Sequence, residues 1–343
     1  MLVKRLVLGL IVALVGAGCG SSPDTGTGAA RRLRVAATVA PVTDIVRQVV
    51  GDRVELAGLI PEGVDSHTFE PSPTTAKALS RADVLFMDGL NLEGSTLEQA
   101  HANMPEVVVV PKTPADALGA GASGSEVIEL GEMTLAPTDF AYDFTFPKSG
   151  GDPNPHLWMS PPYAKRWSEI VRDVMARRDP ANAPYYAANQ ARFGTVIDQL
   201  DAAVVMAVNS IPPDRRKLLT YHDSFAYFAR RYGLEVIGAV QPSDFSEPSP
   251  KDVRDLIAQV NATHVPAVFG SEVFPSRVLE EVARASGARY VDKLRDDELP
   301  GKPSDPEHTY VGLIVSDVRT IVAALAGDPS ALDAVPTAKT WLA

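Results

Sequence analysis

The sequence predicts an α/β protein with two lobes, each a parallel sheet flanked by helices, joined by a single long, rigid helix. Two features of the 343-residue chain lead to this prediction. Short apolar segments alternate with amphipathic stretches, which is the pattern of parallel sheets covered by helices. The alternation stops at residues 183–210, where apolar residues recur every three or four positions, and then begins again.

The first lobe is expected at residues 32–182. Its strands are expected at residues 33–39, 53–60, 82–87 and 107–110, with a short ordered segment at 126–130. Its helices are expected near residues 42–50, 74–80 and 162–178. Residues 138–155 are rich in proline, acidic and aromatic residues, so we expect a long loop there.

The connecting helix at residues 183–210 would span roughly 40 Å, long enough to run along both lobes. The second lobe is expected at residues 211–327, followed by a C-terminal tail at 328–343. Its strands are expected at residues 217–221, 234–240, 265–269 and 289–291. Its helices are expected at residues 225–232, 249–260, 275–286 and 306–325.

The N-terminus has the features of an export signal. Two basic residues precede an apolar stretch at residues 6–15, which is too short for a comfortable membrane span. We expect a signal peptide at 1–18, and its end resembles a bacterial lipobox in which Cys19 is lipidated. The lipid would anchor a flexible tether at 19–31. An ordinary secretory signal is the alternative, because Gly16 stands where the lipobox usually has leucine.

The composition limits the possible partners. A formal net charge of -11 argues against nucleic acid, because nothing in the sequence neutralises phosphates in bulk. Cys19 is the only cysteine, so no intrachain disulfide can form despite export. We expect a monomer that contacts the membrane through the lipid on Cys19.

Three histidines and an aspartate mark a candidate metal site. His67 lies in D-S-H-T-F-E-P-S-P, His156 in D-P-N-P-H-L-W-M-S-P, His222 in L-L-T-Y-H-D-S-F, and Asp292 in A-R-Y-V-D-K-L. His222 and Asp292 directly follow predicted strands, and ligands of open α/β sheets bind beyond the carboxyl ends of strands. Three neutral imidazoles and one carboxylate form a four-ligand set that suits Zn²⁺.

Each of these residues alone has a simpler explanation. A single histidine in a loop is more often an exposed or hydrogen-bonded side chain than a metal ligand. Asp292 is the weakest of the four, because Asp296, Asp297 and Asp305 follow it closely. The joint pattern therefore carries the prediction. The other three histidines have no such context, although His308 is an alternative for a second site.

The four sequence contexts resemble those of the metal-binding receptors of bacterial ABC importers for zinc and manganese. Residues 63–73 match the family stretch G-x-D-P-H-x-[YF]-E-P-[ST]-P except at Ser66. Residues 152–158 match D-P-H-x-W with Asn154-Pro155 inserted. Residues 221–234 match Y-H-D-[AS]-F-x-Y-F-x-x-R-[YF]-G-L almost fully. The similarity covers most of the chain after the tether.

The resemblance implies an extracytoplasmic receptor that holds one metal ion between two lobes and delivers it to an ABC permease with a cytoplasmic ATPase. It places His67 and His156 in the first lobe, and His222 and Asp292 in the second. His222 stands where manganese-binding members carry glutamate, which favours Zn²⁺. Mn²⁺ stays the alternative, because residues 132–155 lack the histidines that many zinc receptors carry in this region.

Other functions explain these residues less well. An exported zinc hydrolase would keep one ligand position open for water, but the chain has no H-E-x-x-H and no evident general base. A haem or siderophore receptor would need aromatic and basic groups, and nothing in the sequence supports adhesion as the primary role. We therefore predict capture of Zn²⁺ in the periplasm or at the cell surface, without bond chemistry.

Overall fold

The computed structural model describes residues 31–109, 124–142, 152–241 and 249–341. One compact unit runs from Arg32 to Ala343. The predicted signal peptide, Cys19 and nearly all of the predicted tether lie outside the described residues, as does the middle of the predicted loop at 138–155. Within the described ranges, no helix is both long and apolar enough to cross a membrane.

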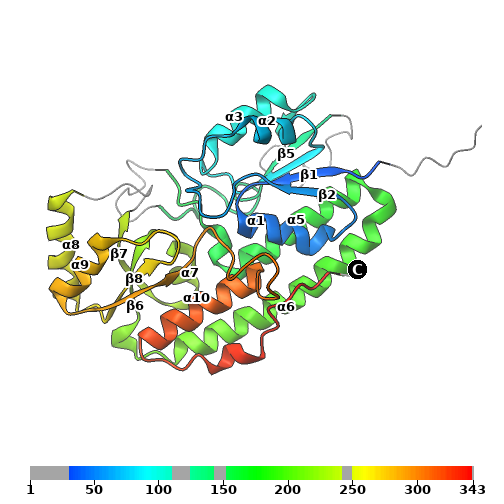
Figure 1. The fold of residues 1–343 in the computed structure, drawn as a ribbon. Helices are drawn as coiled ribbons and strands as arrows, with labels where there is room; N and C mark the ends of the chain where they lie inside the picture. The colour runs from blue at the N-terminus through cyan, green and yellow to red at the C-terminus, as the bar shows by residue number, and fades with distance from the viewer. Residues whose placement is uncertain (1–30, 110–123, 143–151, 242–248, 342–343) are drawn as a thin grey trace, which may run out of the picture. The chain divides into compact units, whose positions relative to one another are not determined.

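The first sheet has five parallel strands in the order β2-β1-β3-β5-β4 (Figure 1). The strands are β1 (Arg34–Ala37), β2 (Glu55–Gly58), β3 (Val84–Met87), β4 (Val108–Val109) and β5 (Glu126–Glu129). The central strand β3 is four consecutive apolar residues, all buried. A strand without polar alternation is typical of a parallel sheet that is covered on both faces.

The second sheet has four parallel strands in the order β7-β6-β8-β9. The strands are β6 (Lys217–His222), β7 (Glu235–Gln241), β8 (Ala267–Ser271) and β9 (Arg289–Leu294). The prediction of two parallel sheets flanked by helices is therefore confirmed. Strand β9 is longer than predicted, because it continues three residues beyond Val291.

Nine α-helices fill the described connections around the sheets. They are α1 (Ala40–Val50), α2 (Pro73–Leu79), α3 (Gly94–Asn103), α5 (Pro161–Arg178), α6 (Ala183–Asn209), α7 (Ala226–Tyr232), α8 (Pro250–Thr263), α9 (Arg277–Ser286) and α10 (Tyr310–Ala324). Helix α3 was not predicted from the sequence. Helix α10 begins four residues later than predicted, because the Thr309 hydroxyl accepts a hydrogen bond from the Gly312 N–H at 3.0 Å and caps it.

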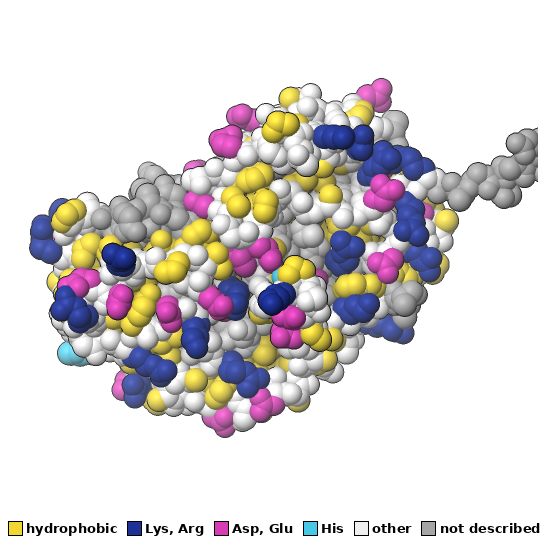
Figure 2. All heavy atoms as spheres, viewed as in Figure 1, with side chains coloured by type: hydrophobic (Ala, Val, Ile, Leu, Met, Phe, Trp, Pro, Cys, Tyr) yellow, Lys and Arg dark blue, Asp and Glu magenta, His cyan; other side chains and the backbone are white. Residues whose placement is uncertain are grey.

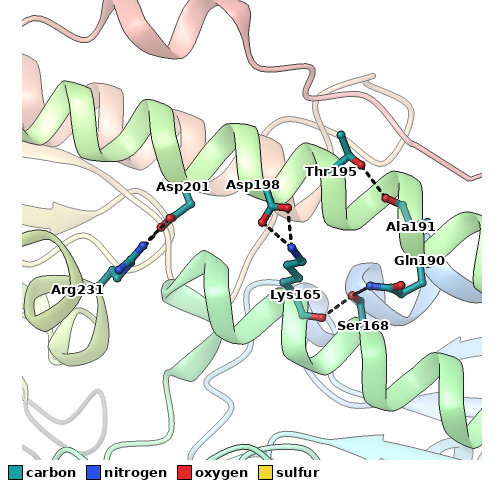
Figure 3. Close-up of polar contacts among 8 residues, drawn as sticks. All are labelled: Lys165, Ser168, Gln190, Ala191, Thr195, Asp198, Asp201 and Arg231. Atoms are coloured by element: carbon teal, nitrogen blue, oxygen red, sulfur yellow. Dashed lines mark hydrogen bonds and ion pairs between the residues drawn. The ribbon is translucent and has the colours of Figure 1, made fainter.

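Helix α6 is bound to helices of both halves of the chain. It packs against α1 and α5 on one side and α10 on another. Lys165 of α5 places its Nζ 2.6 and 2.7 Å from the carboxylate oxygens of Asp198, and Arg231 of α7 lies 2.6 Å from Asp201 (Figure 3). These ion pairs link α6 to α5 and α7, but exposed pairs of this kind add little energy.

The largest apolar cluster is continuous between the two sheets. It includes Val35 and Phe86 of the first sheet and Phe269 of the second. The indole rings of Trp158 and Trp167 lie within the same cluster, with centroids 6.4 Å apart. Large relative movement of the two halves would expose this shared core to water, at about 25 cal/mol per Å² of apolar surface.

The last described residues lie across α1 as a packed segment. The amide and hydroxyl of Thr340 donate to Gln48 Oε1 at 3.0 and 2.9 Å, and Gln48 is fully buried. The Thr309 hydroxyl donates to the Thr337 carbonyl at 2.5 Å. The predicted tail at 328–343 is therefore, as far as it is described, part of the folded unit.

An almost buried ion pair joins the first sheet to α5. Arg177 donates from both terminal nitrogens to the Glu126 carboxylate, at 2.6 and 2.5 Å, and Arg178 lies 3.5 Å from the same group. The Glu126 side chain is 2% exposed and that of Arg178 is 7% exposed. Removing the carboxylate would leave buried guanidinium charge without its counterion.

We predict that Glu126→Ala lowers the free energy of unfolding by about 3–5 kcal/mol, the usual loss when one partner of a buried pair is removed. Urea denaturation followed by circular dichroism measures this change. The control is Glu281→Ala, which removes the exposed pair with Arg284 and should cause no measurable change. Equal effects of the two variants would contradict the assigned importance of burial.

Candidate metal centre

Three imidazole rings meet at one point of the compact unit. The Nε2 atom of His67 lies 3.4 Å from that of His156 and 3.1 Å from that of His222. The Nε2 atoms of His156 and His222 are 3.0 Å apart. Among the described residues, these three form the one group of three or more His, Cys, Asp or Glu whose ligand atoms lie within 4.8 Å of one another.

The three histidines come from the carboxyl edges of both sheets. His67 lies in the loop between β2 and α2, and His222 is the last residue of β6. His156 precedes the short turn at Leu157–Met159 that leads into α5. Parallel strands direct all their carboxyl ends to one edge, which is where such folds hold ligands. The site therefore forms where the ends of two separate sheets face each other.

His67 is held by the turn in which it lies. Asp65 accepts the His67 backbone N–H at 2.9 Å through Oδ1 and the Thr68 hydroxyl at 2.8 Å through Oδ2. The preceding residue, Ser66, is buried and donates its hydroxyl to the Asp297 carboxylate. The loop with the first histidine thus contacts the segment that follows β9.

His156 is the most deeply buried of the three rings. It is 0% exposed, and Trp158 lies edge-on to it with centroids 5.1 Å apart. Burial, and then the nearby rings of His222 and His67, lower its pKa well below the usual 6.5. The imidazole is therefore neutral at physiological pH, so it carries one ring nitrogen with a free lone pair.

The spacing of the nitrogens fits a tetrahedral metal ion. Zinc binds imidazole nitrogen at about 2.1 Å, so two such ligands in tetrahedral geometry lie about 3.4 Å apart. The observed separations of 3.0, 3.1 and 3.4 Å are close to this value. Three imidazoles in the neutral form could not all donate to one another, and a shared cation would satisfy one lone pair from each ring.

The structure does not bring Asp292 to this group. Asp292 is exposed and lies within β9, in register with Gly270 of β8. The prediction assumed that the strand ends at Val291, but β9 continues to Leu294 and holds Asp292 on the sheet. This placement is a correction to the sequence-based ligand set.

Three acidic residues that follow β9 lie buried instead. They are Asp296, Asp297 and Glu298, each at most 5% exposed. Oδ1 of Asp297 and Oδ1 of Asp296 accept no hydrogen bond from the described residues. Burial raises the pKa of Asp297 well above its usual range and that of Asp296 to about 6. Buried carboxylate oxygens without partners are costly, and a nearby cation would compensate them.

Further buried acids lie at the carboxyl edge of the first sheet. Asp88 follows β3, is fully buried, and neither of its carboxylate oxygens accepts a hydrogen bond from the described residues. Glu93 accepts the Thr38 hydroxyl at 2.5 Å and the Asp88 N–H at 3.0 Å. On the face shown in Figure 2, acidic side chains are mixed with basic ones. Burial raises the pKa of Asp88 well above its usual range, and the nearby carboxyl groups of Glu93 and Asp297 raise it further.

Comparison with known proteins identifies the class to which this fold and site belong. The family model described as "Zinc-uptake complex component A periplasmic" (ZnuA) matches residues 35–324. Since that match covers most of the chain, the protein belongs to the ZnuA family of periplasmic zinc-uptake components.

Individual relatives span almost the whole chain. The manganese-binding lipoprotein MntA of Halalkalibacterium halodurans is 26% identical over 317 residues, covering 92% of this chain and 96% of MntA. The zinc-binding protein TroA of Treponema pallidum is 29% identical over 303 residues, covering 85% and 88%. The solved structure of periplasmic TroA superposes with a TM-score of 0.73 at 26% identity, covering 86% of this chain and 99% of that one.

We predict that the metal-free protein loses stability as the pH rises from 5 to 7. Burial raises the pKa of Glu93 from 4.5 to about 7, so between about pH 4.5 and 7 the folded state keeps a proton that the unfolded state has lost. The stability linked to this proton is fully present below about pH 4.5 and is lost as the pH rises through 7. The whole shift corresponds to about 3 kcal/mol.

Urea denaturation of chelator-treated protein at pH 5, 6, 7 and 8 measures this dependence. Glu93→Gln should make this dependence less steep, whereas Glu98→Gln, at an exposed position of helix α3, should leave it unchanged. An unaltered slope in Glu93→Gln would show that Glu93 does not titrate in this range.

Proposed function

We propose that this protein captures Zn²⁺ outside the cytoplasmic membrane and delivers it to an ABC permease driven by a cytoplasmic ATPase. The observation that carries the proposal is the meeting of the Nε2 atoms of His67, His156 and His222 within 3.4 Å. Membership of the ZnuA family supports the transport role. The metal is cargo, so the site must release it as well as bind it.

The ligand set favours zinc over manganese. Manganese prefers oxygen ligands in octahedral geometry, whereas zinc binds imidazole readily in a tetrahedral site. Relatives are named for both metals, with MntA and PsaA named for manganese and TroA for zinc. The three imidazole nitrogens of this chain are therefore our reason for proposing Zn²⁺ as the cargo. Mn²⁺ is the alternative cargo.

We propose Asp297 as the fourth ligand, in place of Asp292. Asp297 is buried beside the loop of His67, because Ser66 donates to its carboxylate. One carboxylate oxygen is held by Ser66, and the other accepts no hydrogen bond from the described residues. A full set of four protein ligands leaves no open position for an activated water, so we propose no catalytic activity.

The exported form is proposed to be a monomer anchored by a lipid on Cys19, with the tether at 19–31 between lipid and compact unit. The lobes are proposed at residues 32–182 and 211–327, with α6 as the connecting helix. The continuous core between the two sheets supports a receptor whose halves move little relative to each other.

Zinc binding is expected to depend on His222. The purified, chelator-treated protein should bind one Zn²⁺ per chain, and equimolar Mn²⁺ should not displace it. His222→Ala should lose the bound zinc or bind it at least about 100-fold more weakly, because a direct ligand is lost. Metal content by mass spectrometry and competition titration measure both quantities.

His101→Ala is the matched control, since His101 is exposed on α3, and it should bind zinc like the wild type. Retention of manganese against equimolar zinc would assign the cargo as manganese. Absence of any stoichiometric metal would reject the proposed function.

The fourth ligand can be identified with three aspartate variants. Asp297→Ala should weaken zinc binding more than about 100-fold, beyond the usual effect of an outer partner. Asp292→Ala should not change it, because that side chain is exposed on β9. Competition against a chelator of known affinity gives the three constants. If Asp296→Ala rather than Asp297→Ala has the large effect, Asp296 is the ligand and our assignment is wrong.

A further inference from the structure

Asn154 connects two of the three histidines. It is fully buried, and its Oδ1 lies 3.1 Å from the backbone nitrogen of His156 and 3.1 Å from the Nδ1 of the same residue. Its Nδ2 lies 2.6 Å from the carbonyl oxygen of Asp223, the residue after His222. One side chain thus contacts the ring of one candidate ligand and the backbone beside another.

Two backbone groups fix the orientation of the Asn154 amide. A backbone N–H can only donate, so the amide atom that faces the His156 nitrogen must be the oxygen. A carbonyl oxygen can only accept, so the atom that faces Asp223 must be the NH₂ group. The two contacts agree with each other, and exchanging the amide oxygen and nitrogen would break both.

The orientation of this amide determines the tautomer of His156. Because the amide oxygen is an acceptor, the Nδ1 atom that faces it must carry the ring proton. In a neutral imidazole the other nitrogen, Nε2, then holds the free lone pair. That atom lies 3.0 and 3.4 Å from the Nε2 atoms of His222 and His67. The tautomer that Asn154 selects is therefore the one that can bind a metal at the centre.

The backbone of Asn154 is held as firmly as its side chain. Its N–H donates to the Ala141 carbonyl at 2.9 Å, and its carbonyl accepts the Tyr227 hydroxyl at 3.0 Å. The Tyr227 oxygen in turn accepts the Ala141 N–H at 3.1 Å. Tyr227 belongs to α7, which follows His222. Asn154 therefore contacts the second half of the chain at two residues, Asp223 and Tyr227, and both lie in the segment after β6.

We propose that Asn154 is a positioning residue, which selects the metal-binding tautomer of His156 and fixes this ring relative to the segment that carries His222. This inference rests on the proposed metal-binding function and assigns part of its affinity to one neutral side chain that does not touch the metal. Outer partners of this kind typically contribute about 10- to 100-fold in metal affinity.

The test compares three variants with the wild type. Asn154→Ala removes both contacts, and Asn154→Asp keeps an acceptor for the Nδ1 proton but loses the donor to Asp223. Asn189→Ala is the control, because Asn189 is also fully buried and its Nδ2 donates to the Val49 carbonyl at 3.0 Å, on the side of α6 that faces α1. Each variant is measured for zinc affinity by chelator competition and for thermal midpoint.

A spectroscopic measurement reads the tautomer directly. In protein labelled with ¹⁵N-histidine, long-range ¹H–¹⁵N correlation spectra distinguish protonated from unprotonated ring nitrogens. In the metal-free wild type, His156 should show a protonated Nδ1 and an unprotonated Nε2. Asn154→Asp should retain this pattern, and Asn154→Ala should show a mixture of both tautomers.

We expect Asn154→Ala to bind zinc about 10- to 100-fold more weakly than the wild type. Asn154→Asp should lose less zinc affinity than Asn154→Ala. Asn189→Ala should lower the thermal midpoint without changing zinc affinity. Wild-type affinity in Asn154→Ala, or a wild-type His156 protonated on Nε2, would overturn the inference while leaving the zinc function intact. If the wild type binds no zinc, the proposed function fails, and the spectra still decide whether Asn154 sets the tautomer.

Discussion

The close approach of three imidazole nitrogens is the constraint on which the rest of this structure depends. Each Nε2 lone pair faces the other two across 3.0 to 3.4 Å, which no arrangement of ring protons satisfies for all three. The surrounding protein holds the rings in place through Asp65, Asn154 and the end of β6. The whole arrangement is one that a divalent cation stabilises.

Such a site requires a scaffold that does not relax when the metal leaves. The apolar core runs from one sheet to the other without a break, and α6 is attached to helices on both sides. The last described segment adds a further connection by way of Gln48. A wide movement of one half against the other would break these contacts, which is the physical basis for the proposed small movement of the lobes.

Much of the fold was predictable because its strands are short apolar segments with clear ends. The long helix α6 was visible as a single uninterrupted pattern, and the three histidines stood out through their flanking residues. Asp292 was predicted to follow its strand, because the apolar pattern seemed to end at Val291. Strand β9 instead continues through exposed Asp292 and Lys293 to the buried Leu294. The roles of Asn154 and Glu93 depend on contacts between distant segments, which a single sequence does not display.

The three histidines are separated by 89 and 66 residues along the chain. An unfolded polypeptide would have to close two long loops to bring them together, and the entropy of that closure makes binding by the unfolded chain weaker than binding by the folded protein. A chain that crosses the membrane unfolded would therefore carry no metal with it. Each molecule would then be metal-free when it folds. It would acquire its first metal ion only from the compartment into which it has been exported.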